Sequence, residues 1–382
     1  MLQKITVKGR VALQLDQQDE KYMRMALSLA EMGKGQTSPN PVVGAVLVND
    51  HRIVGFGAHL KAGKAHAEVH ALTMAGPEAK GSTLYVTLEP CAHYGKTPPC
   101  ADAVVAAGVN RVVVAVEDPF SKVAGQGIVR MREAGLQVDV GCLQEEAQAQ
   151  NAAFLHYART GLPFVTVKLA ATLDGMIATN TGDSFYVTGE ASRTMVHELR
   201  DQVDVVLVGV KTVLADNPRL TVRLVQGGKN PVRAVLDTNL QTPLDAQVLS
   251  ADAPTILFCG PQAPKEAQER LINKGAVVVR TKMIQGRLDL VSVLQHLAAM
   301  GFLHVLVEGG ATAAGSFLQS QLASEIWMFH APKLLGSGIS AIGEQLCVQR
   351  MQESITLKNV THKVIGDDLL TIGTPVYHTE LL

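Results

Sequence analysis

The sequence is poor in aromatic residues and has no excess charge of either sign. Phe, Trp and Tyr make up 4% of its 382 residues, with a single Trp, and 34 Lys and Arg nearly balance 35 Asp and Glu. Nucleic-acid binding relies on basic surfaces and on aromatic side chains that stack on bases, so this composition argues against a nucleic-acid partner. Hydrophobic residues make up 47% of the chain, which excludes a largely disordered protein.

Cysteines are few, and no stretch has the pattern of a membrane span. The five cysteines are widely spaced and odd in number, so a disulfide framework is not expected. Residues 290–307 lack Asp, Glu, Lys and Arg, but they contain Gln, His and Gly and predict a helix followed by a strand. The N-terminus has no apolar core of signal-peptide length. The sequence therefore predicts a cytoplasmic protein with reduced thiols and no membrane partner.

Helix and strand patterns alternate along the chain, which predicts an α/β fold. A length of 382 residues suggests two or three domains. A helical pattern over 143–157 ends before residues 160–163 (Thr-Gly-Leu-Pro), after which a new strand begins, and the segment 355–373 predicts short strands. We therefore expect two domains, residues 1–160 and 161–382.

Four residues of the N-terminal half form a pattern typical of a catalytic zinc site. His66, Cys91 and Cys100 supply one imidazole and two thiolates, a set that leaves the fourth tetrahedral position to water. Glu68 lies two residues after His66, which suits a proton carrier that does not bind the metal. This is the pattern of zinc-dependent base deaminases, except that eight residues separate the cysteines instead of two.

Three longer motifs of this half resemble a known family. Residues 38–44 (SPNPVVG), 66–71 (HAEVHA) and 87–100 (TLEPCAHYGKTPPC) resemble the deaminase half of the bifunctional riboflavin-biosynthesis deaminase/reductase. The resemblance implies a three-layer, cytidine-deaminase-like fold that deaminates a diaminopyrimidinone ribosylamine 5′-phosphate. It implies Zn²⁺ on the three ligands above, with Glu68 as the proton shuttle. The substrate contacts that it implies are Asn40, His59, His93, Lys96 and Thr97.

The C-terminal half contains a phosphate-binding pattern of another kind. Glu308, Gly309 and Gly310 follow a predicted strand and precede a helix of small residues. Glycines let the backbone approach a ligand closely, and the free N–H groups of a helix N-terminus favour phosphate. Residues 336–341 have the spacing of a dinucleotide-binding loop but lack its strand and helix. A nicotinamide site in this half must therefore be of another type.

Residues 167–175 and 208–218 resemble signatures of the reductase half of the same family. The resemblance implies a dihydrofolate-reductase-like α/β fold that binds NADPH and reduces a ribosyl group to ribityl. Arg200 and Arg223 suit a 5′-phosphate because guanidinium forks bind phosphate through two hydrogen bonds. The implied cofactor contacts are Ala171, Tyr186, Thr212, Asp216, Thr238, Gly310, Ala311, Thr312, Ala313, Ala314, Gly315 and Ser316. The implied substrate contacts are Lys168, Ser184, Arg200, Leu220, Arg223 and Glu308, and the proton source is either Lys168 or a bound water.

Two residues depart from the family's pattern. The family has Asp-Pro-Asn-Pro where this chain has Asp-Pro-Phe-Ser, so Phe120 replaces an amide that phenylalanine cannot supply. The family often has Trp where this chain has Tyr186. Any role of that Asn must be lost or supplied by another residue, and Tyr186 must act as the aromatic residue beside the cofactor.

Together these patterns predict a bifunctional enzyme, a zinc-dependent pyrimidine deaminase joined to an NADPH-dependent reductase. Its partners would be a small phosphorylated pyrimidine and, as the family implies, further copies of itself in a homo-oligomer. Alternatives are a chain in which only one half is active, a nucleic-acid base deaminase, and a noncatalytic protein with structural zinc and a ligand-sensing C-terminal half. For the metal site itself, the alternative is a closed zinc site with His70 or His93 as the fourth ligand.

Overall fold

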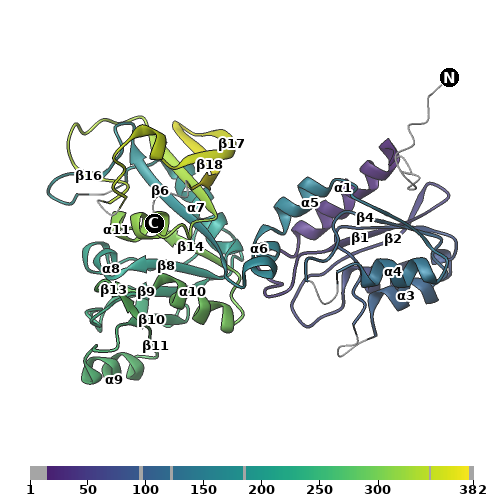
Figure 1. The fold of residues 1–382 in the computed structure, drawn as a ribbon, viewed down its shortest axis with the longest axis horizontal. Coiled ribbons are helices and arrows are strands. Elements are labelled where there is room, and N and C mark those ends of the chain that lie inside the picture. The colour runs from purple at the N-terminus through teal and green to yellow at the C-terminus, as the bar shows by residue number, and fades with distance from the viewer. Residues whose placement is uncertain (1–14, 94–97, 121–123, 184–185, 344–345, 378–382) are drawn as a thin grey trace. The chain divides into compact units, whose positions relative to one another are not determined.

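The computed structural model describes residues 15–93, 98–120, 124–183, 186–343 and 346–377. The chain divides into two compact units (Figure 1), Met1–Arg159 and Thr160–Leu382, called here the N-terminal and the C-terminal unit. In the described part of the chain, no helix combines the length and the apolar character that a membrane crossing requires.

The N-terminal unit contains a five-stranded mixed sheet in the order β2-β1-β3-β4-β5. Strands β2, β1 and β3 pair antiparallel, whereas β3, β4 and β5 run parallel. The strands are β1 (Gly44–Asn49), β2 (Arg52–Ala58), β3 (Thr83–Val86), β4 (Arg111–Val114) and β5 (Gln137–Val140). The helices are α1 (Gln17–Glu31), α2 (Ala67–Ala75), α3 (Cys100–Ala106), α4 (Gln126–Glu133), α5 (Gln144–Gln150) and α6 (Ala152–Thr160).

Glycines in β1 and β2 let helices pack closely on both faces of this sheet. A Cβ at Gly44 would lie 1.9 Å from the Ala26 carbonyl oxygen of α1, and one at Gly57 would lie 2.6 Å from the Ala67 carbonyl oxygen of α2. Gly57 pairs with Ala45, the residue after Gly44. Because neighbouring residues of a strand point to opposite faces, α1 and α2 cover opposite faces. This gives the three layers that the sequence predicts.

The C-terminal unit contains a nine-stranded sheet in the order β11-β10-β9-β8-β14-β6-β15-β18-β17, with β14 between β8 and β6 (Figure 1). Adjacent strands run parallel to each other from β11 through β15 in this order. Strand β18 runs antiparallel to β15, and β17 runs antiparallel to β18. These strands are β6 (Phe164–Thr172), β8 (Val205–Gly209), β9 (Val232–Leu236), β10 (Thr255–Cys259), β11 (Val277–Arg280), β14 (His304–Glu308), β15 (Glu325–Ala331), β17 (Thr356–Ile365) and β18 (Asp368–Val376). The remaining short strands are β7 (Met176–Ala178), β12 (Met283–Ile284), β13 (Arg287–Leu288) and β16 (Ile339–Ser340). The helices are α7 (Glu190–Gln202), α8 (Val210–Asp216), α9 (Lys265–Asn273), α10 (Leu290–Ala299) and α11 (Ala311–Gln319).

Two local predictions are wrong. The helical pattern over 143–157 forms two helices, α5 and α6, because Asn151 lies between them and its side chain hydrogen-bonds both the N–H and the carbonyl oxygen of Val42, at 2.9 Å each. The segment 355–373 forms a hairpin of two long strands, β17 and β18, instead of several short ones.

A buried charge network connects α1 to the sheet of the N-terminal unit. The Arg111 guanidinium donates to both carboxylate oxygens of Asp19, at 2.7 and 2.9 Å, and to Asp139 at 2.8 Å, and the Tyr85 hydroxyl donates to Asp19 at 2.9 Å. Burial raises the pKa of Asp19, but the hydrogen bonds from Arg111, the Asp16 amide and Tyr85 lower it more, so its pKa lies below the ordinary value.

We predict that Asp19→Asn lowers the free energy of unfolding of this unit by about 2 kcal/mol at neutral pH. The destabilisation should be smaller than that of breaking a fully buried ion pair, because Arg111 is 22% exposed and still pairs with Asp139 in the variant. Since the folded-state pKa of Asp19 is depressed, its contribution is complete above the unfolded-state value of about 3.9 and is lost as the pH falls below it. The difference between wild type and variant should therefore shrink on acidification.

Calorimetry of the full chain between acidic and neutral pH measures this difference. Fluorescence of the single Trp, Trp327, identifies the transition of the C-terminal unit. The control is Glu20→Gln, which breaks an exposed pair with Arg24 and should change stability by less than about 0.5 kcal/mol. If the difference in the free energy of unfolding between wild type and Asp19→Asn did not change with pH, the ionised Asp19 carboxylate would not be the source of the stabilisation.

Candidate active sites

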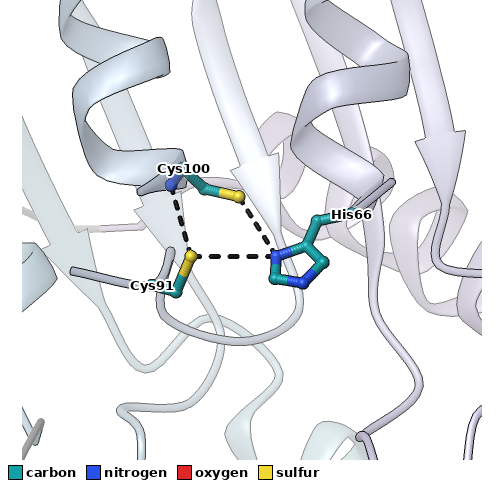
Figure 2. Close-up of side chains that lie close together, drawn as sticks. All are labelled: His66, Cys91 and Cys100. Atoms are coloured by element: carbon teal, nitrogen blue, oxygen red, sulfur yellow. Dashed lines mark hydrogen bonds between the residues drawn. The ribbon is translucent and has the colours of Figure 1, made fainter. Parts of the chain in front are cut away.

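Three metal-binding side chains meet in the N-terminal unit, as Figure 2 shows. His66 is the N-cap of α2, Cys100 is the first residue of α3, and Cys91 lies between β3 and α3. His66 Nδ1 lies 3.2 Å from Cys100 Sγ and 3.7 Å from Cys91 Sγ, and the Cys100 amide donates to Cys91 Sγ at 3.2 Å. Cys100 therefore does lie beside the other two side chains, as the prediction required despite the long cysteine spacing.

These side chains fit zinc in chemistry and in spacing. Tetrahedral zinc at its usual bond lengths separates a nitrogen and a sulfur ligand by roughly 3.6 Å, which the two nitrogen–sulfur distances bracket. Hydrogen bonds with Cys100 and His66 lower the pKa of Cys91, whereas the hydrogen bond with Cys91 and burial raise the pKa of Cys100, so the thiolate form is favoured at Cys91. Among the described residues, neither His70 nor His93 joins this group. A tetrahedral zinc bound by these three side chains would keep one further position for water, as a catalytic site requires.

The predicted proton carrier lies beside these ligands. Glu68 is the second residue of α2 and is 3% exposed. Burial raises the pKa of its carboxyl group, against opposing effects that include the charge of His66 and a hydrogen bond with Cys100. A carboxyl group in this setting is suited to accept and return a proton.

Two of the predicted substrate residues lie next to the metal ligands. The His59 ring is buried and stands edge-on to the His66 ring, with centroids 5.3 Å apart. Its Nδ1 donates to the Ala65 carbonyl oxygen at 3.1 Å, so its Nε2 accepts from the Asn40 amide at 3.2 Å. His93 is exposed. Lys96 and Thr97 lie outside the described residues.

Phe120, which replaces the family's Asn, makes an aromatic packing contact. Its ring packs on Phe154 of α6, with centroids 5.4 Å apart in a T-shaped arrangement, and its N–H donates to Asp118 Oδ1 at 2.9 Å.

In the C-terminal unit, predicted cofactor residues gather where parallel strands end. Gly309 and Gly310 follow β14 and have positive φ angles of 98° and 75°. A Cβ at Gly310 would lie 3.0 Å from Thr212 Oγ1 of α8, which follows the neighbouring strand β8. Within the described ranges, no side chain caps the N-terminus of α11, which begins at Ala311. This edge can therefore receive the phosphates of a dinucleotide close to the backbone.

The other predicted cofactor residues lie along the same edge or near it. Ala171 is buried close to the end of β6, Asp216 is the last residue of α8, and Thr238 follows β9. Tyr186 is 54% exposed, and Arg193 lies over its ring at 4.2 Å. The predicted substrate residue Ser184 lies outside the described residues.

Glu308 is buried at the end of β14 and is paired with Arg200 of α7. Arg200 Nε and Nη2 donate to the two carboxylate oxygens at 2.5 and 2.8 Å, and Nη1 donates to the Thr221 carbonyl oxygen at 3.1 Å. Burial raises the pKa of Glu308, but Arg200 and then Lys168 lower it below the ordinary value. Lys168 pairs with Glu308 in the register of β6 and β14, and burial lowers the pKa of Lys168.

The two arginines expected to bind a phosphate are thus in different situations. All three nitrogens of the Arg200 guanidinium are occupied within the protein, whereas Arg223 is exposed and donates from Nη1 to Thr221 Oγ1 at 3.0 Å. Leu220 packs in the core with a φ of 53°, which is unusual for a leucine.

The comparisons with known proteins cover both units. The RibD C-terminal domain family matches residues 163–371, and the cytidine and deoxycytidylate deaminase zinc-binding region matches residues 16–116. The riboflavin biosynthesis protein RibD of Aquifex aeolicus is 46% identical over 353 residues, which cover 92% of this chain and 97% of that protein. The chain belongs to the RibD family. It is a bifunctional enzyme of riboflavin biosynthesis, with a zinc-dependent deaminase and an NADPH-dependent reductase.

Solved RibD structures agree with this assignment. Acinetobacter baumannii RibD has a TM-score of 0.85 and 37% identity, and covers 94% of this chain and 99% of that chain. A Thermotoga maritima structure described as a diaminohydroxyphosphoribosylaminopyrimidine deaminase/5-amino-6-(5-phosphoribosylamino)uracil reductase has a TM-score of 0.82 and 35% identity over the same shares. The expected fold class, a three-layer cytidine-deaminase-like domain followed by a dihydrofolate-reductase-like α/β domain, is confirmed.

Two buried residues beside the sites, His197 and Glu89, were not predicted from the sequence. His197 is buried one turn before Arg200 on α7, where burial and the charges of Arg200 and Arg223 lower its pKa to about 4, and its Nδ1 accepts from the Arg223 amide at 3.0 Å. The sequence did contain a signal for His197, because residues three positions apart on a helix lie on the same face, and His197 stands three residues before Arg200. Glu89 is buried and accepts hydrogen bonds from the backbone, although its motif was recognised.

We predict that Cys100→Ser lowers zinc affinity by at least about tenfold, because a hydroxyl replaces a thiolate ligand. Metal analysis after dialysis against a chelator measures the zinc that each chain keeps. Cys347→Ser is the control, since Cys347 is exposed and belongs to the C-terminal unit, and it should keep its zinc. Retention of zinc and of the deamination rate by Cys100→Ser would contradict the ligand assignment.

Proposed function

We propose that the N-terminal unit deaminates a diaminopyrimidinone ribosylamine 5′-phosphate and that the C-terminal unit reduces the ribosyl group of the product to ribityl. The substrate follows from the similarity to the Thermotoga maritima enzyme and its described reactions. The observation that carries the proposal is that one chain combines the His66, Cys91 and Cys100 cluster, with a buried Glu68 beside it, and a separate buried Glu308–Arg200 pair.

In the deaminase, Glu68 moves the protons. Zinc, when bound by His66, Cys91 and Cys100, would supply Lewis-acid activation of an attacking water. Glu68 would accept a proton as the water oxygen bonds to the ring carbon that bears the amino group, and would return it to that amino group, which leaves as ammonia. His59 and Asn40, fixed by their mutual hydrogen bond, would orient the ring, and His93, Lys96 and Thr97 would contact the rest of the substrate.

In the reductase, the charged residues would have different roles. When bound, NADPH would supply the hydride for reduction at C1′ of the opened ribosyl group. Arg223, with its exposed guanidinium, would bind the 5′-phosphate, while Arg200 holds Glu308 in place to accept hydrogen bonds from sugar hydroxyls. Lys168, whose pKa is lowered by burial, would supply the proton. Leu220 and Ser184 would complete the substrate contacts.

The cofactor contacts are proposed along the carboxyl edge of the sheet. The backbone N–H groups of Gly310, Ala311 and Thr312 would face the phosphates. Thr212 lies against the glycine turn, and Tyr186 would pack beside the nicotinamide. The other proposed contacts are Ala171, Asp216, Thr238, Ala313, Ala314, Gly315 and Ser316.

Membership of the family does not by itself determine the quaternary structure, the cellular location or the partners of this chain. A homo-oligomer, a cytoplasmic location and the absence of a nucleic-acid partner stay predictions. The domain limits 1–160 and 161–382 also stay a proposal about independently folding parts.

The test follows ammonia release and NADPH absorbance separately. Wild type with zinc and the pyrimidine should release ammonia before NADPH is added, and then oxidise NADPH. Glu68→Gln should slow ammonia release by about 10³-fold but still reduce a deaminated substrate. Glu308→Gln should show the reverse pattern, so each variant is the control for the other.

Two outcomes would contradict the proposal. Ammonia release that requires NADPH would exclude an independent deaminase. Unchanged NADPH absorbance with a deaminated substrate would exclude the reductase assignment.

A further inference from the structure

Glu89 is a buried carboxylate whose partners are backbone amides. It is 5% exposed and lies two residues before the metal ligand Cys91. Its Oε1 accepts from the amides of Gly127 and Ile128, at 2.8 and 3.2 Å, and its Oε2 accepts from those of Asp118 and Gly125, both at 3.0 Å. Four backbone N–H groups thus satisfy both oxygens of the Glu89 side chain.

These four amides come from the two ends of the connection between β4 and α4. Asp118 follows β4, while Gly125 is the N-cap of α4 and Gly127 lies in its first turn. One carboxylate oxygen therefore joins both ends of the connection, and the other oxygen fixes the start of α4. A Cβ at Gly127 would lie 2.1 Å from the Pro90 carbonyl oxygen, so α4 begins directly against the backbone that precedes Cys91.

The same elements border the deaminase site. The Asp118 side chain is half-buried, and it interacts electrostatically with Cys91 and His93. From α4, Arg130 donates to the Ala92 carbonyl oxygen at 3.2 Å and pairs with Asp102 of α3 at 2.6 Å. A displacement of the β4–α4 connection would therefore move the surroundings of Cys91 and His93.

We propose that Glu89 is a positioning residue of the deaminase, which holds the β4–α4 connection against the Cys91 segment and so shapes the wall that receives the pyrimidine. Glu89 acts through the backbone of Asp118, Gly125, Gly127 and Ile128. The proposal rests on the deaminase function proposed above.

The test is Glu89→Gln in the full-length, zinc-loaded enzyme. Glutamine has nearly the same shape, but its NH₂ group must face two N–H donors, so one pair of hydrogen bonds is lost. We expect the KM for the pyrimidine to rise by about tenfold or more while kcat changes less, with the zinc content and the reductase rate unchanged. Hydrogen exchange should become faster at the amides of residues 118, 125, 127 and 128.

Asp19→Asn is the matched control. It makes the same carboxylate-to-amide change in the same unit at similar burial, 3% exposed, but its partner is Arg111 at the start of β4. It should lower the melting temperature and leave the KM for the pyrimidine unchanged.

An unchanged KM for Glu89→Gln, or a loss of zinc together with the reductase rate, would overturn the proposal, since the first shows no role in substrate binding and the second only a role in folding. If the wild type released no ammonia, the proposed function would fail instead. The exchange rates of the four amides would still decide whether Glu89 holds the connection.

Discussion

Both sites depend on carboxylates that are buried where strands end. Water cannot solvate such a group, and an uncompensated buried charge costs several kcal/mol, so each carboxylate dictates what must lie around it. In the N-terminal unit, Glu89 is compensated by four backbone amides, which fixes a connection beside Cys91. In the C-terminal unit, Glu308 is compensated by the fork of Arg200 and by Lys168 in the neighbouring strand.

The compensation differs because the two sites handle charge differently. In the N-terminal unit, His66 and Cys100 lie at the starts of two helices, and Glu68, the proposed proton carrier, is buried in the first turn of α2. The reductase instead uses parallel strand register to place Lys168 beside Glu308. The two groups of side chains therefore belong to different units of the chain.

Motifs that are local in the sequence were predictable, and contacts between distant segments were not. The metal ligands stand in recognisable short motifs, so their meeting around His66 could be expected even across the long cysteine spacing. The Arg200–Glu308 pair joins residues 108 positions apart, and nothing in the pattern around Arg200 separates a phosphate ligand from an internal partner. In the same way, the break at Asn151 depends on Val42, which lies in another part of the sequence.

The measurement that tests this account most directly is a double-mutant cycle on the Arg200–Glu308 pair, with unfolding of the C-terminal unit followed through the fluorescence of Trp327. Arg200→Gln and Glu308→Gln should each lower the free energy of unfolding by about 3 kcal/mol, because each leaves the other charge buried and unpaired. The double variant should be more stable than the sum of the two losses predicts, by about 2 kcal/mol. Simple addition of the two losses would contradict the claim that these charges compensate each other.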